Sequence, residues 1–367
     1  MAHRIMEWRC PFHFSKAEYA ISIEISDLDL CYFYTVNIGL LLRHSNYKVL
    51  VTGGAGFIGS NLCDALIDRG YFVKCLDNFS TGKIENISHL ENHNLFRFIE
   101  GDIRDFETCK KACDGIDIVF HQAALGSVPR SIADPITSNN VNITGFINML
   151  VAAKDSGVKR FIYAGSSSTY GDSTALPKVE ENIGNPLSPY AVTKMVMEHY
   201  ARVFHQVYGM DTIGLRYFNV FGQRQDPEGA YAAVIPKFVL LLMNGKSPII
   251  NGTGEYSRDF TYIDNVIEAN LLSMTTSEQS ALNQVYNVAC GERTTLNEMV
   301  SLLKFFLSAK DEKIAHIPII YGNSRAGDIP HSLASIDKAM ELLSYKPLVN
   351  FREGLKKSVD WYYEHLK

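Results

Sequence analysis

The sequence predicts an α/β fold in which a doubly wound parallel sheet is followed by a smaller α/β region at the C-terminal end. From Lys48 onward, short β-branched runs alternate with helical stretches, which is typical of a parallel sheet with crossover helices. A glycine-rich turn joins the first of these runs to the first helical stretch. After Asn219 the pattern changes to shorter elements, separated by loops that contain proline and glycine.

The alternating part contains six expected strands and four expected helices. The strands are Lys48–Thr52, Phe72–Asp77, Phe96–Glu100, Ile116–His121, Arg160–Gly165 and Thr212–Tyr217. The helices are Ile58–Arg69, Phe106–Cys113, Ile136–Ser156 and Ser188–Tyr208, each long enough for a right-handed crossover. Beyond Asn219, shorter elements are expected at Ala233–Met243, Asn265–Thr275, Leu296–Leu307 and Ser335–Leu343.

These patterns divide the chain into three parts. Residues 1–45 are an N-terminal extension of unknown role, residues 46–218 carry the sheet, and residues 219–367 form the smaller region. No clear linker separates the last two parts, so we expect them to share one cleft. Ligands of open α/β sheets bind beyond the carboxyl ends of the strands.

Composition and charge exclude several classes of protein. A net charge of -5 without a basic stripe argues against a nucleic-acid-binding surface. The seven cysteines are odd in number and lack CxxC pairs, which fits a cytoplasmic protein without a metal site. In the N-terminal extension, the apolar run Leu28–Leu42 is short and contains Asp29 and Asn37, so no membrane span is expected. A peripheral membrane contact of this run stays open.

The glycine-rich turn reads GGAGFIG over residues 53–59 and indicates a Rossmann-type dinucleotide site. Gly53 permits the tight turn, Gly56 lets the backbone approach a pyrophosphate, and Gly59 allows close packing of helix on strand. The N-terminus of the following helix attracts the anion. Asp77 closes the second strand 18 residues after Gly59, where a carboxylate can accept both ribose hydroxyls and repel a 2′-phosphate. NAD is therefore expected rather than NADP.

Tyr190 and Lys194 stand at i and i+4, one turn apart on one helix face. The ammonium and a nearby nicotinamide cation both favour the phenolate, so Tyr190 can act as acid and base near neutral pH. The run SSSTYG, residues 166–171, begins 24 residues upstream of Tyr190 and directly follows the fifth expected strand. Its Ser166 hydroxyl can hold the reacting oxygen of a substrate.

Together, GxxGxxG, SSSTYG and YxxxK resemble the motifs of the extended short-chain dehydrogenases that act on nucleotide sugars, and the resemblance covers residues 48–367. The 4,6-dehydratases of that superfamily carry an Asp-Glu pair where this chain has Ser167 and Ser168, so the resemblance implies redox chemistry at C4 without elimination. Residues 121–135, 188–194 and 215–237 are similar to UDP-N-acetylglucosamine 4-epimerases of bacterial surface-polysaccharide pathways. The implied reaction oxidises a UDP-N-acetylhexosamine to a 4-keto sugar, lets the hexose turn, and reduces its opposite face.

The resemblance also implies roles for individual residues. Those expected to contact NAD are Gly53, Gly56, Phe57, Ile58, Gly59, Asp77, Asn78, Asp102, Ile103, Gln122, Ala123, Ala124, Tyr190, Lys194 and Tyr217. Ser166, Ser167 and Ser168 are expected to contact the UDP-sugar, and its diphosphate is expected to contact Asn219, Arg258 and Arg325. Asp328 is expected at the ribose, and Ala233, Val234 and Lys237 of the Tyr231–Lys237 segment are expected at the uracil. Ser127 and Gln225 are expected at the N-acetyl amide. The forked guanidinium of arginine suits phosphate oxygens.

Ser332 is expected to face the C2 substituent of the sugar. Bacterial UDP-galactose 4-epimerases resemble this chain but carry a bulky tyrosine there, so a serine leaves room for an N-acetyl group. UDP-glucose or UDP-glucuronate 4-epimerases, or a decarboxylase of the same fold, stay open as alternatives. A non-catalytic NAD-binding regulator is a further alternative, although such proteins have usually lost YxxxK. In the resembled family, the helices expected at Ile136–Ser156 and Ser188–Tyr208 pair with their copies, which implies a homodimer.

Overall fold

The computed structural model describes residues 47–228, 232–323 and 330–366. The N-terminal extension and its run Leu28–Leu42 therefore lie outside the described residues. So do Tyr231, Arg325 and Asp328 of the expected substrate site.

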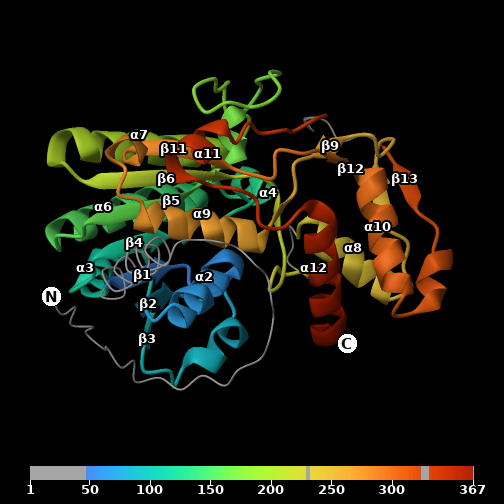
Figure 1. Cartoon of the computed structure of the whole chain (residues 1–367), viewed down its shortest axis with the longest axis horizontal. Helices are drawn as coiled ribbons and strands as arrows, with labels where there is room; N and C mark the ends of the chain where they lie inside the picture. The colour runs from blue at the N-terminus through green and yellow to red at the C-terminus, as the bar shows by residue number, and fades with distance from the viewer. Residues whose placement is uncertain (1–46, 229–231, 324–329, 367) are drawn as a thin grey trace, which may run out of the picture. The chain divides into compact units, whose positions relative to one another are not determined.

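Seven parallel strands form the central sheet, in the order β11-β6-β5-β4-β1-β2-β3 (Figure 1). Their bounds are β1 Lys48–Thr52, β2 Phe72–Asp77, β3 Phe96–Glu100, β4 Ile118–His121, β5 Arg160–Ser166, β6 Asp211–Tyr217 and β11 Gln284–Val288. Because β1 lies between β2 and β4, the strand order reverses there, and doubly wound sheets bind ligands at such a point. The predicted Rossmann-type fold is confirmed.

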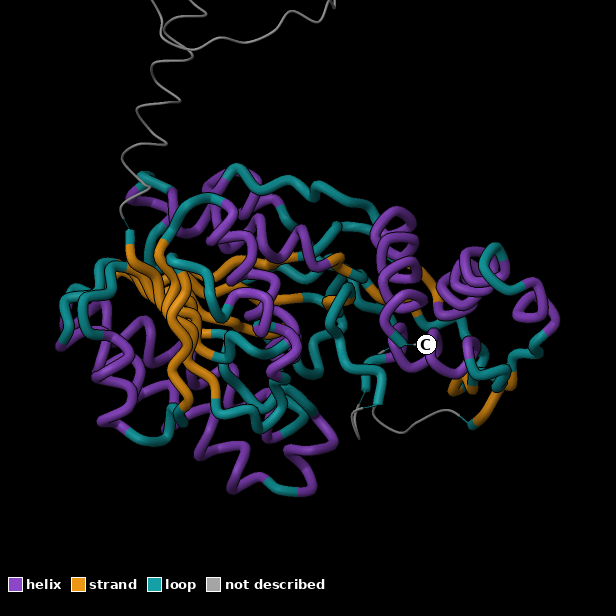
Figure 2. The backbone as a smooth tube through the Cα atoms, turned by 90° about the horizontal axis from the view of Figure 1, so that it is seen from below, coloured by secondary structure: helices purple, strands orange, loops and turns teal. Residues whose placement is uncertain are grey.

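Helices cover both faces of the sheet (Figure 2). One face carries α2 (Phe57–Asp68) and α9 (Ile263–Thr275), and the other carries α3 (Phe106–Cys113), α6 (Gly145–Asp155) and α7 (Pro189–Tyr208). Along β1, Val49 and Val51 face the first layer and Leu50 faces the second, because successive side chains of a strand alternate between faces. Both faces of β1 are therefore buried, which explains its continuous apolar sequence.

Local signals set the ends of these helices. The Asp105 carboxylate caps α3 by accepting hydrogen bonds from the N–H groups of the first turn. Ser188 caps α7, and Pro189 follows at the first helical position. α7 ends at Gly209, whose φ of 68° is left-handed and suits glycine.

Three of the differences between the expected and the observed elements concern the sheet and its crossover segments. β4 begins at Ile118 instead of Ile116. The single helix expected from Ile136 is built from α5 (Pro135–Asn139), a π-helical segment η3 (Asn140–Thr144) and α6. β11 was not among the expected strands, and it pairs with β6. The sheet thus draws a strand from the part of the chain that was assigned mainly to substrate binding.

The smaller region is built from short elements around three two-stranded sheets. Its helices are α8 Val234–Met243, α10 Leu296–Ser308, α11 Asp337–Leu343 and α12 Phe351–His365, while α4 Val128–Ala133 follows β4. The short strands pair as β7 Val220–Phe221 with β10 Thr261–Tyr262, β9 Ser257–Arg258 with β12 Thr294–Thr295, and β8 Ile249–Asn251 with β13 Ile320–Gly322. Short 3₁₀ turns lie at Ile84–Asn86, Ser88–Leu90, Ser167–Tyr170, Gln279–Ala281 and Glu312–His316. Among the described residues, no helix is both long and apolar enough to cross a membrane.

Candidate active site

A pocket of about 370 Å³ lies where β1, β2, β3 and β4 end. Of the residues expected to contact NAD, it brings together Gly53, Gly56, Phe57, Ile58, Gly59, Asp77, Asn78, Asp102, Ile103, Gln122, Ala123 and Ala124. These residues come from four separate loops, and the parallel sheet places them at one edge because all its strands end there.

The glycine turn forms the part of this pocket nearest the sheet. Gly53 has a φ of 69°, and a Cβ at this position would lie 2.7 Å from the backbone nitrogen of Ala123. A Cβ at Gly59 would collide with the carbonyl oxygen of Gly53. Gly56, the N-cap of α2, provides no capping side chain, so the first N–H groups of the helix can serve an anionic ligand. The turn therefore fits the pyrophosphate of a dinucleotide.

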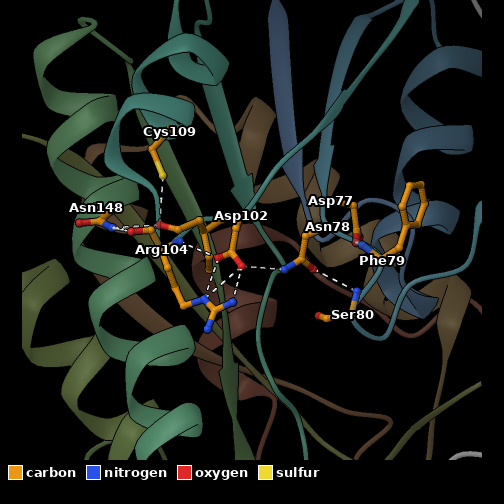
Figure 3. Close-up of polar contacts among 9 residues, drawn as sticks. Asp77, Asn78, Phe79, Ser80, Asp102, Arg104, Cys109 and Asn148 are labelled. Atoms are coloured by element: carbon orange, nitrogen blue, oxygen red, sulfur yellow. Dashed lines mark hydrogen bonds and ion pairs between the residues drawn. The ribbon is translucent and has the colours of Figure 1, made fainter.

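Asp77 is fixed against this turn at the end of β2 (Figure 3). Its carboxylate accepts hydrogen bonds from the N–H groups of Ala55, at 2.9 Å, and Phe79, at 2.8 Å. Burial raises the pKa of Asp77, and the backbone donors oppose that rise. The carboxylate is thus held at the pocket wall, where the ribose of NAD was expected.

Asp102 and Asn78 also line this pocket, and they contact each other (Figure 3). The Asn78 amide donates to Asp102 at 2.8 Å, and Arg104 forms an ion pair with Asp102 at 2.6 Å. The hydrogen bond from Arg104 lowers the pKa of Asp102, so this carboxylate stays ionised and can accept a donor such as an amino group.

Tyr217, which was expected to contact NAD, lies behind a residue of the pocket instead. Its hydroxyl donates to the Gln122 side chain at 3.2 Å, and Asn270 donates to the same hydroxyl at 2.9 Å. Gln122 lines the pocket and Tyr217 does not. Tyr217 therefore orients Gln122 from behind in this structure.

The catalytic candidates meet between α7 and the end of β5. Lys194 is buried, its Nζ donates to the carbonyl oxygen of Ala164 at 2.7 Å, and it lies 5.9 Å from the centre of the Tyr190 ring. Burial lowers the pKa of Lys194 to about 8 and raises that of Tyr190, while a hydrogen bond with Ser166 opposes the rise at Tyr190. The pKa of Lys194 thus falls below that of Tyr190, and the Ser166 hydrogen bond is the contact that favours release of the phenol proton.

Polar contacts attach the catalytic helix to the segments that follow β4. The N–H of Tyr190 donates to the Ser131 hydroxyl of α4 at 3.0 Å. Asn142, in the π-helical segment η3, donates to the Thr193 hydroxyl at 3.1 Å and accepts from the N–H of Leu125 at 2.8 Å. Local π-helical geometry often marks functional sites, and here it places Asn142 between two parts of the site.

A second pocket, of about 250 Å³, lies beside the small sheets. Of the expected substrate residues it contains Asn219, Val234, Lys237 and Arg258, together with the apolar side chains of Phe238, Ile249, Ile250, Phe260 and Leu296. Ala233 lies next to it as the N-cap of α8. Two cationic side chains over an apolar floor suit a phosphorylated ligand with a flat ring.

The remaining substrate candidates that the structure describes line neither this pocket nor the first. Ser332 is half-buried, and its N–H donates to the carbonyl oxygen of Ser257 at 3.0 Å, next to Arg258. The Ser127 hydroxyl accepts from the N–H of Arg130 as the cap of α4. The Gln225 amide donates to the Val220 carbonyl, and Gln225 lines neither of the pockets described above. Ser167 and Ser168 are half-buried in the 3₁₀ turn after Ser166.

Several pocket residues were absent from the prediction. They are Leu76, Ser80, Thr81, Leu125, Gly126, Thr137 and Val141 in the first pocket, and Phe238, Ile249, Ile250, Asn251, Phe260 and Leu296 in the second. Ser80 and Thr81 follow the end of β2, so the rule that ligands bind beyond strand ends could have found them. Thr137 and Val141 line the pocket because of where α5 and η3 lie against the strand ends, a tertiary placement that no local pattern shows.

Comparisons with known proteins agree with this geometry. Residues 49–289 match the model of the NAD dependent epimerase/dehydratase family. A UDP-N-acetylglucosamine 4-epimerase from Methanobrevibacter ruminantium M1, solved with UDP-N-acetylmuramic acid, is 41% identical, with 87% of this chain and 98% of that chain covered and a TM-score of 0.80. A UDP-glucuronic acid 4-epimerase from Bacillus cereus, solved with UDP-glucuronic acid and NAD, is 32% identical, with 86% and 99% covered and a TM-score of 0.78. The UDP-glucose 4-epimerase of Mycolicibacterium smegmatis is 34% identical, with 86% of this chain and 98% of that protein covered.

Proposed function

Because the chain belongs to the NAD dependent epimerase/dehydratase family, we propose that it inverts C4 of a UDP-N-acetylhexosamine. The broader activity follows from the relatives: the chain is a UDP-sugar 4-epimerase, and NAD is its cofactor. Those relatives act on different UDP-sugars, so the preference for an N-acetyl group has to come from residues of this chain.

Ser332 is the observation that supports an N-acetylated sugar. Its side chain is small and half-buried, and it lies beside the strand of Arg258. The similarity to the archaeal UDP-N-acetylglucosamine 4-epimerase points the same way. A serine here neither blocks an acetamide nor supplies the positive charge that a C6 carboxylate would attract, so UDP-glucose and UDP-glucuronate rank second.

The residues of the first pocket would hold NAD, which would supply the acceptor, and later the donor, of a hydride at C4. Tyr190 takes the proton of the 4-hydroxyl as C4 is oxidised, and Ser166 holds the same oxygen. Lys194 keeps a positive charge near the phenolate. After the hexose has turned, Tyr190 returns the proton to the opposite face, so that no net oxidation occurs and the cofactor stays bound.

Holding the nucleotide tightly and the sugar loosely reconciles affinity with this rotation. Asn219, Lys237 and Arg258 line one pocket and would hold the diphosphate, while the apolar floor around Phe260 would lie under the uracil. Binding energy from the UDP end then keeps the substrate in place while the hexose changes the face that it presents.

The same proposal includes a cytoplasmic homodimer. All the cysteines that the structure describes are free thiols, as expected in a reducing compartment. The family resemblance implies pairing through α5, α6 and α7. Apolar side chains on these helices, such as Ile136, at 73% relative exposure, and Val207, at 64%, are available for such pairing.

The substrate assignment can be tested without added cofactor. Purified protein is incubated separately with UDP-N-acetylglucosamine, UDP-glucose and UDP-glucuronate, and the anomeric protons are followed by NMR. We expect the highest kcat/KM with UDP-N-acetylglucosamine. Ser332→Tyr should lower that value at least tenfold and spare UDP-glucose, whereas Ser332→Ala should resemble the wild type. Faster conversion of UDP-glucose or UDP-glucuronate by the wild type would refute the N-acetyl preference.

A further inference from the structure

Asp259 is a completely buried carboxylate that the predicted mechanism does not use. It lies between Arg258 and Phe260, both of which line the second pocket. One of its oxygens accepts from the N–H of Cys290 at 3.0 Å, and the other accepts from the N–H groups of Gly291 at 3.1 Å and Ala334 at 3.2 Å. A single side chain thus joins the end of β11 to the segment that carries Ser332.

Burial raises the pKa of Asp259 to about 7, and its three backbone hydrogen bonds oppose the rise only in part. Burying a carboxylate costs free energy, which hydrogen bonds offset only in part here, so this side chain suggests a role beyond packing. The segments that it connects indicate what that role is.

The backbone around Asp259 contacts both ends of the proposed substrate site. The Asn219 amide donates to the carbonyl oxygen of Asp259 at 3.0 Å, which places one diphosphate candidate directly beside the other, Arg258. On the opposite side, the N–H of Ser257 donates to the Pro330 carbonyl, and the N–H of Ser332 donates to the Ser257 carbonyl, both at 3.0 Å.

The segment 330–334 therefore runs along the strand of Arg258, and two kinds of contact hold it there. Backbone hydrogen bonds with Ser257 hold its first half, and its second half is held by the Asp259 carboxylate at Ala334 and by the Lys178 N–H, which donates to the Leu333 carbonyl at 2.7 Å. Ser332 lies between these two attachments, so its distance from the diphosphate candidates depends on both.

We propose that Asp259 is a positioning residue that sets the distance between the diphosphate anchor, Asn219 and Arg258, and the wall of the sugar pocket at Ser332. Asp259 does not contact the substrate in this arrangement. It determines how well the hexose and its C2 substituent fit once UDP is bound, and in this respect the inference rests on the proposed function of Ser332.

Asp259→Asn is the direct test, because the amide keeps the shape but replaces one acceptor oxygen with a donor. The link from Asn219 to the backbone of residue 259 is retained. We expect the dissociation constant for UDP alone to change less than twofold. The KM for the preferred UDP-sugar should rise at least fivefold with kcat changed less than threefold, and the preference for N-acetylated over plain UDP-hexose should fall at least fivefold.

Asp259→Glu keeps the charge but shifts the carboxylate. It should alter the same preference for N-acetylated over plain UDP-hexose, and it carries the test if Asp259→Asn does not fold.

Asp117→Asn is the matched control. Asp117 accepts from the N–H of Lys48 at 3.0 Å at the opposite edge of the sheet. The same chemical change there should lower stability. It should change neither the ratio of UDP-sugar affinity to UDP affinity nor the preference for N-acetylated over plain UDP-hexose. An unchanged UDP-sugar to UDP affinity ratio in the Asp259 variants, or an equal change in Asp117→Asn, would overturn the inference. Should the wild type prefer a plain UDP-hexose, the N-acetyl proposal fails by itself, and Asp259 is judged by the affinity ratio with that sugar.

Discussion

Lys194 carries its charge in surroundings that oppose it. The side chain is buried in α7 against β5, and the group that accepts a hydrogen bond from its ammonium, the carbonyl oxygen of Ala164, is uncharged. Glu198, one turn further along α7, raises the pKa of Lys194, but burial has the larger effect and brings it to about 8. The residue that supports Tyr190 is therefore kept charged at neutral pH by a narrow margin.

This margin predicts the alkaline limit of activity. Lys194 is protonated below about pH 8 and loses its charge as the pH rises through that value, so kcat should fall with a midpoint near pH 8. Lys194→Arg, whose guanidinium stays charged, should retain a fraction of the activity and show no such fall up to pH 10. Initial rates between pH 6 and 10 measure this, and an unchanged wild-type rate up to pH 10 would contradict the role given to Lys194.

The same burial predicts that Lys194→Met stabilises the protein while abolishing turnover. The folded-state pKa of about 8 lies below the ordinary 10.5, so the unfolded chain binds more protons between these values and stability rises with pH across that range. Below pH 8 the difference corresponds to roughly 3 kcal/mol, and the lost hydrogen bond offsets about 1 kcal/mol. Urea unfolding at pH 7 should show a gain of about 2 kcal/mol that shrinks by pH 10. The control Lys110→Met, at an exposed position, should show almost no gain in the free energy of unfolding. A Lys194→Met protein less stable than the wild type would refute the argument.

The sequence identified the residues whose function depends on local spacing. Gly53, Asp77, Tyr190 and Lys194 follow strands or share a helix face, so short motifs suffice to find them. Asp259 acts on backbone groups 31 and 75 residues away, and no short pattern could reveal those partners.

At the scale of elements, α7 and β6 are joined by a buried ion pair. Arg216 contacts Glu198 through two hydrogen bonds, at 2.8 and 2.7 Å, and its guanidinium lies 4.9 Å from the centre of the Tyr170 ring. Both charged side chains are almost completely buried. The pair fixes the helix of Tyr190 and Lys194 against the strand that leads to Asn219.

Breaking this pair from one side should cost more than removing it entirely. Glu198→Gln leaves the Arg216 charge buried, so we expect unfolding to become easier by about 3–5 kcal/mol. Glu198→Leu combined with Arg216→Met should recover at least half of that loss. Glu107→Gln, which breaks an exposed pair with Lys110, should cost less than about 1 kcal/mol. Guanidinium unfolding with a double-mutant cycle measures these values, and additive losses at the two positions would argue against coupling.

Elements with strong local signals were predicted almost to the residue. β1, β2, β3 and α3 have the expected bounds, because a buried strand or a capped helix is recognisable without its neighbours. β11 was missed because a short stretch such as QVYNV becomes a strand only by pairing with β6, about 70 residues earlier. The π-helical segment η3 depends on Asn142 reaching both Leu125 and Thr193, which again is a tertiary effect.

At the scale of the whole molecule, the catalytic and substrate candidates belong to different layers. The first pocket and Tyr190 lie at the sheet edge, whereas Arg258 and Lys237 lie on short elements of the smaller region. Strand β11 and helix α9, from the second half of the chain, pack directly on the sheet. This shared packing explains why the sequence showed no clear linker after residue 218.

Helices α5 and α7 leave apolar side chains exposed, and these predict the oligomeric state. Between them lies a groove lined by Pro135, Ile136, Asn139, Asn140, Ile143, Pro189, Val192 and Thr193. Because helices that pack only on their own sheet turn polar residues outward, side chains such as Ile136 and Val207 are better explained by a second copy of the chain. We therefore expect a dimer at micromolar concentration.

Ile136→Glu combined with Val207→Glu should give a monomer that still retains NAD, measured by sedimentation velocity and absorbance. Ile320→Glu, an equally drastic change at an exposed position on β13, should leave the dimer intact. A wild-type monomer at these concentrations would leave the apolar faces of α5 and α7 to a different partner and would remove the homodimer from the proposed function.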